Sequence, residues 1–311
     1  MTYVALLCSY LSLVVGVLIC VAFIVLLERS VLGYIQIRKG PNKVGVSGVL
    51  QSFSDAIKLF TKEQTVPSFS NMIIFYFSPV FMFLVVLFMW SVMPMFSNFV
   101  NLELGAVLFF CCTGASVYGL LGSGWGSNSN YSMLGAMRGV AQTISYEVSL
   151  ILFFLSVVCL TGGYNFLLFH VNQEYISYLF VMYPVFIMWL ISALAETNRT
   201  PFDFAEGESE LVSGFNVEYG SGGFAILFLG EYASIVFMSY LMVIMFLGGL
   251  SNMYVVNMLG VWFCFVFIWM RGTYPRLRYD KLMMLAWKSL LPASLSLVMF
   301  YYLVGLVKGL V

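Results

Sequence analysis

The sequence predicts an all-α, polytopic membrane protein. Of its 311 residues, 61% are hydrophobic and only 9% are charged, and the mean hydropathy is +0.97. A helix crosses a bilayer core of about 30 Å with about 20 apolar residues. Eight apolar runs of this kind lie between the charged residues, at about 2–27, 71–93, 104–122, 133–160, 175–196, 222–248, 254–270 and 285–307. We therefore expect a single integral membrane domain, 1–311, with about eight transmembrane helices.

The basic residues support this arrangement because they fall on one side of it. Thirteen of the fourteen Lys and Arg residues lie in or beside the connections after the first, third, fifth and seventh predicted helices, and Lys308 lies on the other side. Basic loops stay on the side from which a helix inserts. The connections at about 28–70, 123–132, 197–221 and 271–284 should therefore share one compartment, with both termini in the other.

The first long connection contains a predicted amphipathic helix from Gln51 to Glu63. One face carries Phe53, Ala56, Ile57 and Phe60, and the other carries Gln51, Asp55, Lys58 and Lys62. This pattern is typical of a helix that lies at the membrane interface. Such a helix either borders an opening for a lipid-like substrate or serves as an ordinary anchor, and the periodicity does not choose between them.

Several kinds of chemistry lack the residues they need. A haem held between helices usually needs His ligands, and His170 is the only histidine. The six cysteines show no spacing for a disulfide, a metal or an iron-sulfur cluster. The glycine-rich run from Gly122 to Gly126 lacks the lysine and the strand of a phosphate loop, and we interpret it as a turn between helices. The zero net charge gives no electrostatic support for nucleic-acid binding.

The strongest functional signal is a short acidic stretch. Six of the fourteen carboxylates lie between Glu196 and Glu218, where Arg199 is the only cation. Carboxylates that repel one another hold their protons more tightly, which raises the pKa of some of them. The stretch therefore suits the uptake and release of protons, although a solvated loop rich in glutamate is the alternative. It occurs once, which weighs against a transporter built from two related halves.

Two predicted transmembrane helices carry charged residues within the span. Placing a charge inside the bilayer costs free energy, so such residues are interpreted as functional by default. Arg138 and Glu147 both lie in the fourth predicted helix, nine positions apart in the sequence. This separation puts them on opposite faces of the helix and about 13 Å apart along its axis, so they cannot pair with each other. Glu231 precedes Tyr232 in the sixth helix, and Glu196 ends the fifth. Three successive helices thus each present a carboxylate that can exchange protons, unless each is paired with a cation of another chain.

These residues lie within motifs that resemble the family of subunit 1 of respiratory NADH:ubiquinone oxidoreductase, complex I. The resemblance runs through the whole chain and rests on Glu28-Arg29 with Leu32-Gly33-Tyr34 and Arg38–Asn42, on Asp55–Glu63, on Ser127–Tyr131 with Ala141–Glu147, on Glu196–Tyr219, and on Arg271–Arg276 with Arg278-Tyr279-Asp280. Frequent Phe and Met resemble the mitochondrially encoded versions of insects and other arthropods. Ser30 is a departure, because the family commonly has Lys there.

The resemblance implies a subunit of the mitochondrial inner membrane whose basic loops face the matrix and whose termini face the intermembrane space. It would form the membrane side of a ubiquinone channel, with ubiquinone as substrate and no cofactor bound covalently. FMN, NADH and the iron-sulfur clusters would belong to other subunits. Its partners would be the peripheral-arm subunit that carries the terminal cluster, the hydrogenase-like neighbour of that subunit, small hydrophobic membrane-arm subunits, and lipids such as cardiolipin.

The resemblance also assigns residue roles, none of them covalent catalysis or metal binding. The proton path would contain Glu147, Glu196, Glu231, Tyr232 and Arg138. The quinone chamber and acidic loop would contain Glu28, Arg29, Arg199, Phe202, Asp203, Glu206, Glu208, Glu210 and Arg278. Quinone reduction would then shift protonation of the loop and of the path. The alternatives are a proton-coupled transporter that acts alone, a structural anchor for a peripheral complex, and a membrane-hydrogenase relative.

Overall fold

The computed structural model describes residues 2–94, 102–205, 207, 211–248 and 253–309. These residues form helices and connecting segments and contain no strand, which confirms the all-α fold. The helices are α1 (Thr2–Ile35), α2 (Gln51–Thr61), α3 (Met72–Met89), α4 (Gly105–Ser127), α5 (Asn130–Thr161), α6 (Phe166–Val171), α7 (Tyr178–Val181), α8 (Tyr183–Glu196), α10 (Ser221–Leu247), α11 (Met253–Thr273), α12 (Tyr279–Met284) and α13 (Leu291–Lys308). A π-helical turn, Leu285–Leu290, joins α12 to α13.

Within the described residues, seven helical segments are long and apolar enough to cross a membrane. They comprise most of α1, α11 and the joined α12 and α13, together with all of α4, α5 and α10 and the run Met72–Val92. The predicted amphipathic helix is confirmed as α2. The predicted fifth span, 175–196, differs, because it is divided at Met182 into α7 and the 14-residue α8. Pro184 lies in the first turn of α8, where its ring favours a helix start rather than a continuing helix.

Other boundaries also differ from the expectation. Helix α1 continues to Ile35, and the last span begins at Tyr279, so the connections around them are shorter than predicted. The glycine-rich run Gly122–Gly126, predicted as a turn, lies inside α4. Its small residues allow close packing: a Cβ at Gly124 would lie 2.3 Å from the Ala136 Cβ, and one at Gly126 would lie 2.9 Å from the Phe75 nitrogen. Small residues at helix contacts are the usual means of close approach in membranes.

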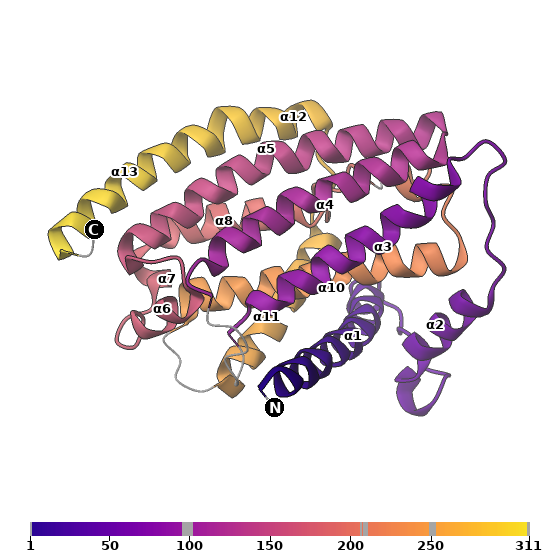
Figure 1. Cartoon of the computed structure of the whole chain (residues 1–311), viewed down its shortest axis with the longest axis horizontal. Helices are drawn as coiled ribbons and strands as arrows, with labels where there is room; N and C mark the ends of the chain where they lie inside the picture. Colours follow the sequence, from indigo (N-terminus) through magenta and orange to yellow (C-terminus); the bar gives the residue numbers. More distant parts are fainter. Residues whose placement is uncertain (1, 95–101, 206, 208–210, 249–252, 310–311) are drawn as a thin grey trace.

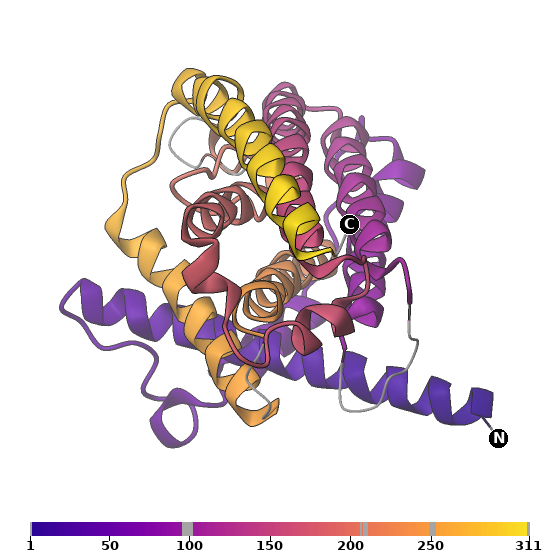
Figure 2. The same cartoon turned by 90° about the vertical axis from the view of Figure 1, so that its left-hand side faces the viewer.

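The long helices form a bundle around α10 (Figures 1 and 2). Helix α10 packs against α1, α3 and α11, and α5 packs against α4, α8 and α13. Helix α10 is also the most enclosed of the seven spans, whereas α1 crosses the outside of the bundle. In Figure 1 the carboxyl end of the chain lies at the left, the amino end lies near the middle of the lower edge, and α2 lies at the right with the turn between α4 and α5. The fold thus surrounds α10 with helices that carry the predicted site residues.

Candidate functional site

A buried cluster of charges joins α1 to three other segments. Glu28 of α1 is only 5% exposed. It forms an ion pair with Arg271 of α11, and its Oε1 lies 3.6 Å from Nη1 of Arg199, in the connection after α8. The Arg199 guanidinium lies 4.4 Å from the centre of the Tyr232 ring on α10, a cation–π contact. The structure therefore brings together three residues that were assigned to two different functional groups from the sequence.

A second ion pair attaches the amphipathic helix to the bundle. Arg29 pairs with Asp55 of α2, and the Gln51 amide donates to the same carboxylate over 3.0 Å. The Phe23 and Phe53 rings meet edge to face, with their centroids 6.2 Å apart. Charge and aromatic contact therefore both hold α2 beside α1.

The acidic stretch is fixed at its start by α5. The Gln142 side chain, fully buried, donates to the Ala195 carbonyl over 2.8 Å and to the Phe202 carbonyl over 2.7 Å. Asp203, which is 5% exposed, pairs with Arg276 over 3.0 Å. Glu206, Glu208 and Glu210 lie outside the described residues.

The end of the same stretch is attached to α3 by Tyr219. Its ring stacks on Phe75 with centroids 4.2 Å apart, and its hydroxyl donates to the Phe75 carbonyl over 3.1 Å. Ser78 lies 3.0 Å from the same hydroxyl. Burial raises the pKa of Tyr219 to about 12, although the Ser78 hydrogen bond opposes the shift. Tyr219 is therefore protonated at neutral pH and acts as a stable hydrogen-bond donor.

An amphipathic cavity of about 520 Å³ lies between α1, α2 and α10. Its polar side is formed by Glu28, Arg29, Asp55, Tyr232 and Arg271. The rest of the wall is mainly apolar and includes Val21, Val25, Leu32, Ala56, Leu59, Phe60, Phe224, Phe228 and Leu229. The charged cluster thus lies at one side of an otherwise apolar cavity.

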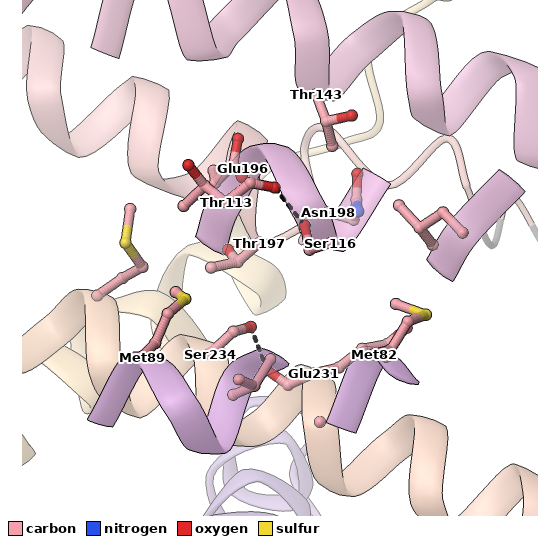
Figure 3. A pocket seen from close by; sticks show the side chains of 14 residues that line it. Met82, Met89, Thr113, Ser116, Thr143, Glu196, Thr197, Asn198, Glu231 and Ser234 are labelled. Carbon is pink, nitrogen blue, oxygen red and sulfur yellow. Dashed lines mark hydrogen bonds between the residues drawn. The ribbon is translucent and has the colours of Figure 1, made fainter. Parts of the chain in front are cut away.

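A second, smaller cavity is lined by two of the three helix carboxylates, Glu196 and Glu231. Glu196 and Glu231 line it from opposite walls (Figure 3), and Thr113, Ser116, Thr143 and Ser234 contribute hydroxyl-bearing side chains to the lining. Its volume of about 60 Å³ holds a few water molecules, since one water needs about 10–15 Å³ by this measure. Glu147 of α5 reaches the wall through Thr113, whose hydroxyl lies 3.1 Å from the Glu147 Oε1. Glu147 is close enough to Glu196 for their charges to interact.

The structure leaves two predicted site residues apart from these clusters. Arg278 pairs with Asp280 over 3.0 Å, and both side chains are mostly exposed. Arg138 lies on α5, is half-buried, and is not among the lining residues of either cavity. Sequence reasoning missed the roles of Asp55, Thr113, Arg271 and Arg276. Asp55, Arg271 and Arg276 lie within the motifs that carry the family resemblance, but these motifs did not indicate which residues they would pair with.

Fold and site together define a class: a polytopic membrane protein that encloses carboxylates next to an amphipathic cavity. The NADH dehydrogenase family model matches residues 8–302. NADH-ubiquinone oxidoreductase chain 1 of Anopheles gambiae is 58% identical over 94% of this chain and 93% of its own length. The chain of the same name from Aedes aegypti is 56% identical over 97% of this chain and 96% of its own length. The one from Locusta migratoria is 54% identical over 94% of this chain and 93% of its own length.

The chain therefore belongs to the NADH-ubiquinone oxidoreductase chain 1 family and is a membrane subunit of this oxidoreductase complex. Family membership decides against the transporter that acts alone, which the sequence left as an alternative.

Proposed function

We propose that the chain forms the membrane side of a ubiquinone-binding channel, with the amphipathic cavity between α1, α2 and α10 as its wall. The volume of about 520 Å³ falls within the range of small-molecule sites, about 300–1,000 Å³. The apolar residues suit an isoprenoid tail. Arg29, Tyr232 and Arg271 carry donors that suit the carbonyl oxygens of a quinone ring. The names of the curated relatives support ubiquinone as the substrate.

Reduction of the quinone to the quinol takes two electrons and two protons. We assign electron delivery to the iron-sulfur subunit of the complex, so this chain supplies binding and charge balance. Glu28 forms ion pairs with Arg199 and Arg271. Because both signs of charge are present, this cluster can compensate a charge change on the bound quinone ring without leaving an isolated buried charge.

One observation carries the coupling part of the proposal: α10 is a wall of both cavities. Tyr232 faces the amphipathic cavity, and the preceding residue, Glu231, lines the carboxylate cavity. Successive helical residues point about 100° apart, so one helix presents the two side chains to different spaces. A charge change beside Tyr232 thus occurs next to the residue, Glu231, whose carboxylate lines the second cavity. Glu196 and Glu147 continue this path towards further membrane subunits.

The remaining assignments follow from the same proposal. Asp203, with Glu206, Glu208 and Glu210, would form the acidic loop beside the quinone chamber, and Arg276 balances Asp203. The complex would lie in the mitochondrial inner membrane, with α2 on the matrix side. If neutralising Glu206 and Glu208 impaired assembly but left turnover of the assembled complex unchanged, the structural-anchor alternative would be preferred for this loop.

Photoaffinity labelling tests the channel. A ubiquinone analogue with a photoreactive tail, added to the assembled complex in membranes, should label peptides that contain Leu59–Phe60 and Phe224–Phe228. Excess ubiquinone should suppress the labelling. Labelling confined to the lipid-facing half of α1, with no competition by ubiquinone, would refute the channel.

Replacing Glu147 with Gln tests the coupling. In the assembled complex, reconstituted into vesicles, this change should reduce proton translocation per NADH oxidised or block quinone reduction. Electron transfer from NADH to an artificial acceptor on the peripheral arm should be unchanged. Normal quinone reduction together with normal pumping would reject the role of Glu147.

A further inference from the structure

A buried hydroxyl stands between Glu147 and the carboxylate cavity. Thr113 of α4 is 3% exposed and lines the cavity that contains Glu196 and Glu231. Glu147 is not among the residues that line this cavity, but its Oε1 lies 3.1 Å from the Thr113 Oγ1. Figure 3 shows Thr113 next to Glu196 on the same wall. Thr113 therefore occupies the boundary between one carboxylate and the space shared by the other two.

The Thr113 hydroxyl has two partners on the protein but a single proton. Its Oγ1 lies 2.9 Å from the Phe110 carbonyl oxygen as well as 3.1 Å from Glu147. The carbonyl can only accept, whereas a carboxyl group donates when protonated and only accepts when ionised. Protonated Glu147 can therefore donate to Thr113 while Thr113 donates to Phe110. Ionised Glu147 requires the Thr113 proton to turn towards it.

The Glu147 carboxylate is also held close to α4. A Cβ at Gly114 would lie 3.3 Å from the Glu147 Oε1, so the carboxylate occupies space that a side chain at this position would fill. The contact keeps Oε1 beside the neighbouring Thr113 hydroxyl. The pair is thus positioned by packing as well as by the hydrogen bond.

We propose that Thr113 relays protons between Glu147 and the carboxylate cavity. The Thr113 hydroxyl first turns from the Phe110 carbonyl to a water molecule in the cavity. The Glu147 O–H bond then breaks as its proton passes to the Thr113 oxygen, while the original Thr113 O–H bond breaks and that proton passes to the water molecule. The net result is an ionised Glu147, an unchanged threonine and one proton in the space shared with Glu196 and Glu231. The hydroxyl then turns back for the next transfer. This inference rests on the proposed function of Glu147.

The test compares variants of Thr113 in the assembled complex, reconstituted into vesicles. Thr113→Val keeps the side-chain shape but removes the hydroxyl, and Thr113→Ser restores it. We expect proton translocation coupled to NADH oxidation to be about tenfold slower in Thr113→Val, the effect of losing one hydrogen bond to a charged group, and near normal in Thr113→Ser. Infrared difference spectra should show a shifted carboxyl band of Glu147 only in the variant that lacks the hydroxyl.

Controls separate this inference from the proposed function. Ser123→Ala removes a buried hydroxyl of α4 that donates to the Leu120 carbonyl and does not line the cavity, and it should leave pumping unchanged. Rates are expressed per assembled complex, and Thr113→Ala provides a second hydroxyl-free variant if Thr113→Val assembles poorly. If Glu147→Gln abolishes pumping while Thr113→Val and Thr113→Ala pump normally, the relay is refuted and the role of Glu147 stands. If Glu147→Gln also pumps normally, the proposed function itself fails.

Discussion

At the scale of single residues, Glu28 holds three segments together by charge. Its carboxylate is buried between Arg271 and Arg199, and Arg199 in turn contacts the Tyr232 ring. A buried ion pair contributes little when it is compared with an apolar replacement, but removing one partner leaves the other charge without compensation. The residue is therefore more sensitive to substitution than an exposed acid of the same type.

We expect Glu28→Gln to destabilise the subunit at the lower end of the range for breaking a buried pair, about 3–5 kcal/mol, because Arg271 is one-third exposed. Thermal inactivation of quinone reduction in membranes measures the effect. Asp280→Asn is the matched control, because its pair with Arg278 is mostly exposed and is worth about 0–1 kcal/mol. Equal inactivation of the two variants would contradict the assignment.

At the scale of elements, α2 lies at the edge of the bundle, where it packs against α1 and α10. No residue of α2 is fully buried, and its contacts to α1 include the Arg29–Asp55 pair and the edge-to-face contact of Phe53 with Phe23. An exposed ion pair adds little, so the aromatic contact should contribute much of the attachment. Because α2 forms part of the cavity wall, its attachment affects access to the cavity.

Phe53→Ala should loosen α2. We expect faster hydrogen exchange across residues 51–61 and a higher KM for quinones with long tails, because the wall formed by Leu59 and Phe60 would no longer be held in place. Hydrogen-exchange mass spectrometry and quinone titration measure these effects. Ile57→Ala is the control, since that side chain is 64% exposed. An unchanged exchange rate in Phe53→Ala would show that other contacts hold α2.

At the scale of the whole molecule, the bundle has two distinct ends. The end of α13 lies at one end, and α2 and the turn between α4 and α5 lie at the other (Figure 1). In the sequence, thirteen of the fourteen Lys and Arg residues lie in or beside connections that the rule for membrane insertion assigns to one side. The proposed matrix side is therefore the side of α2, of the turn between α4 and α5 and of the connection that contains the acidic stretch.

This arrangement predicts which segments are accessible from each side. An epitope tag at the carboxyl terminus should react with antibody in mitochondria whose outer membrane alone has been opened. Cleavage by trypsin at Arg38–Lys43 should occur only when the matrix face is exposed. The reverse pattern of accessibility would overturn the proposed orientation.

Much of the site could be predicted from the sequence because charge is rare in this chain. Glu28, Glu147, Glu196 and Glu231 stand out against apolar runs, and all four lie beside the two cavities. The role of Arg278 stays a prediction, since the structure places it in an exposed pair. Thr113 was not identified, because a single hydroxyl on an apolar helix more often donates to its own backbone.

The sequence by itself determined the all-α fold, seven of the eight predicted spans, the amphipathic helix and the charged residues that lie within or beside apolar segments. These properties depend on hydropathy and on helical periodicity, which are local. Only the tertiary structure decided that Arg271 and Arg199 meet Glu28, that Arg276 meets Asp203, and that Tyr232 and Glu231 face two different cavities. Contacts between residues as many as 243 positions apart depend on how helices pack, and packing depends on side-chain shape across the whole bundle.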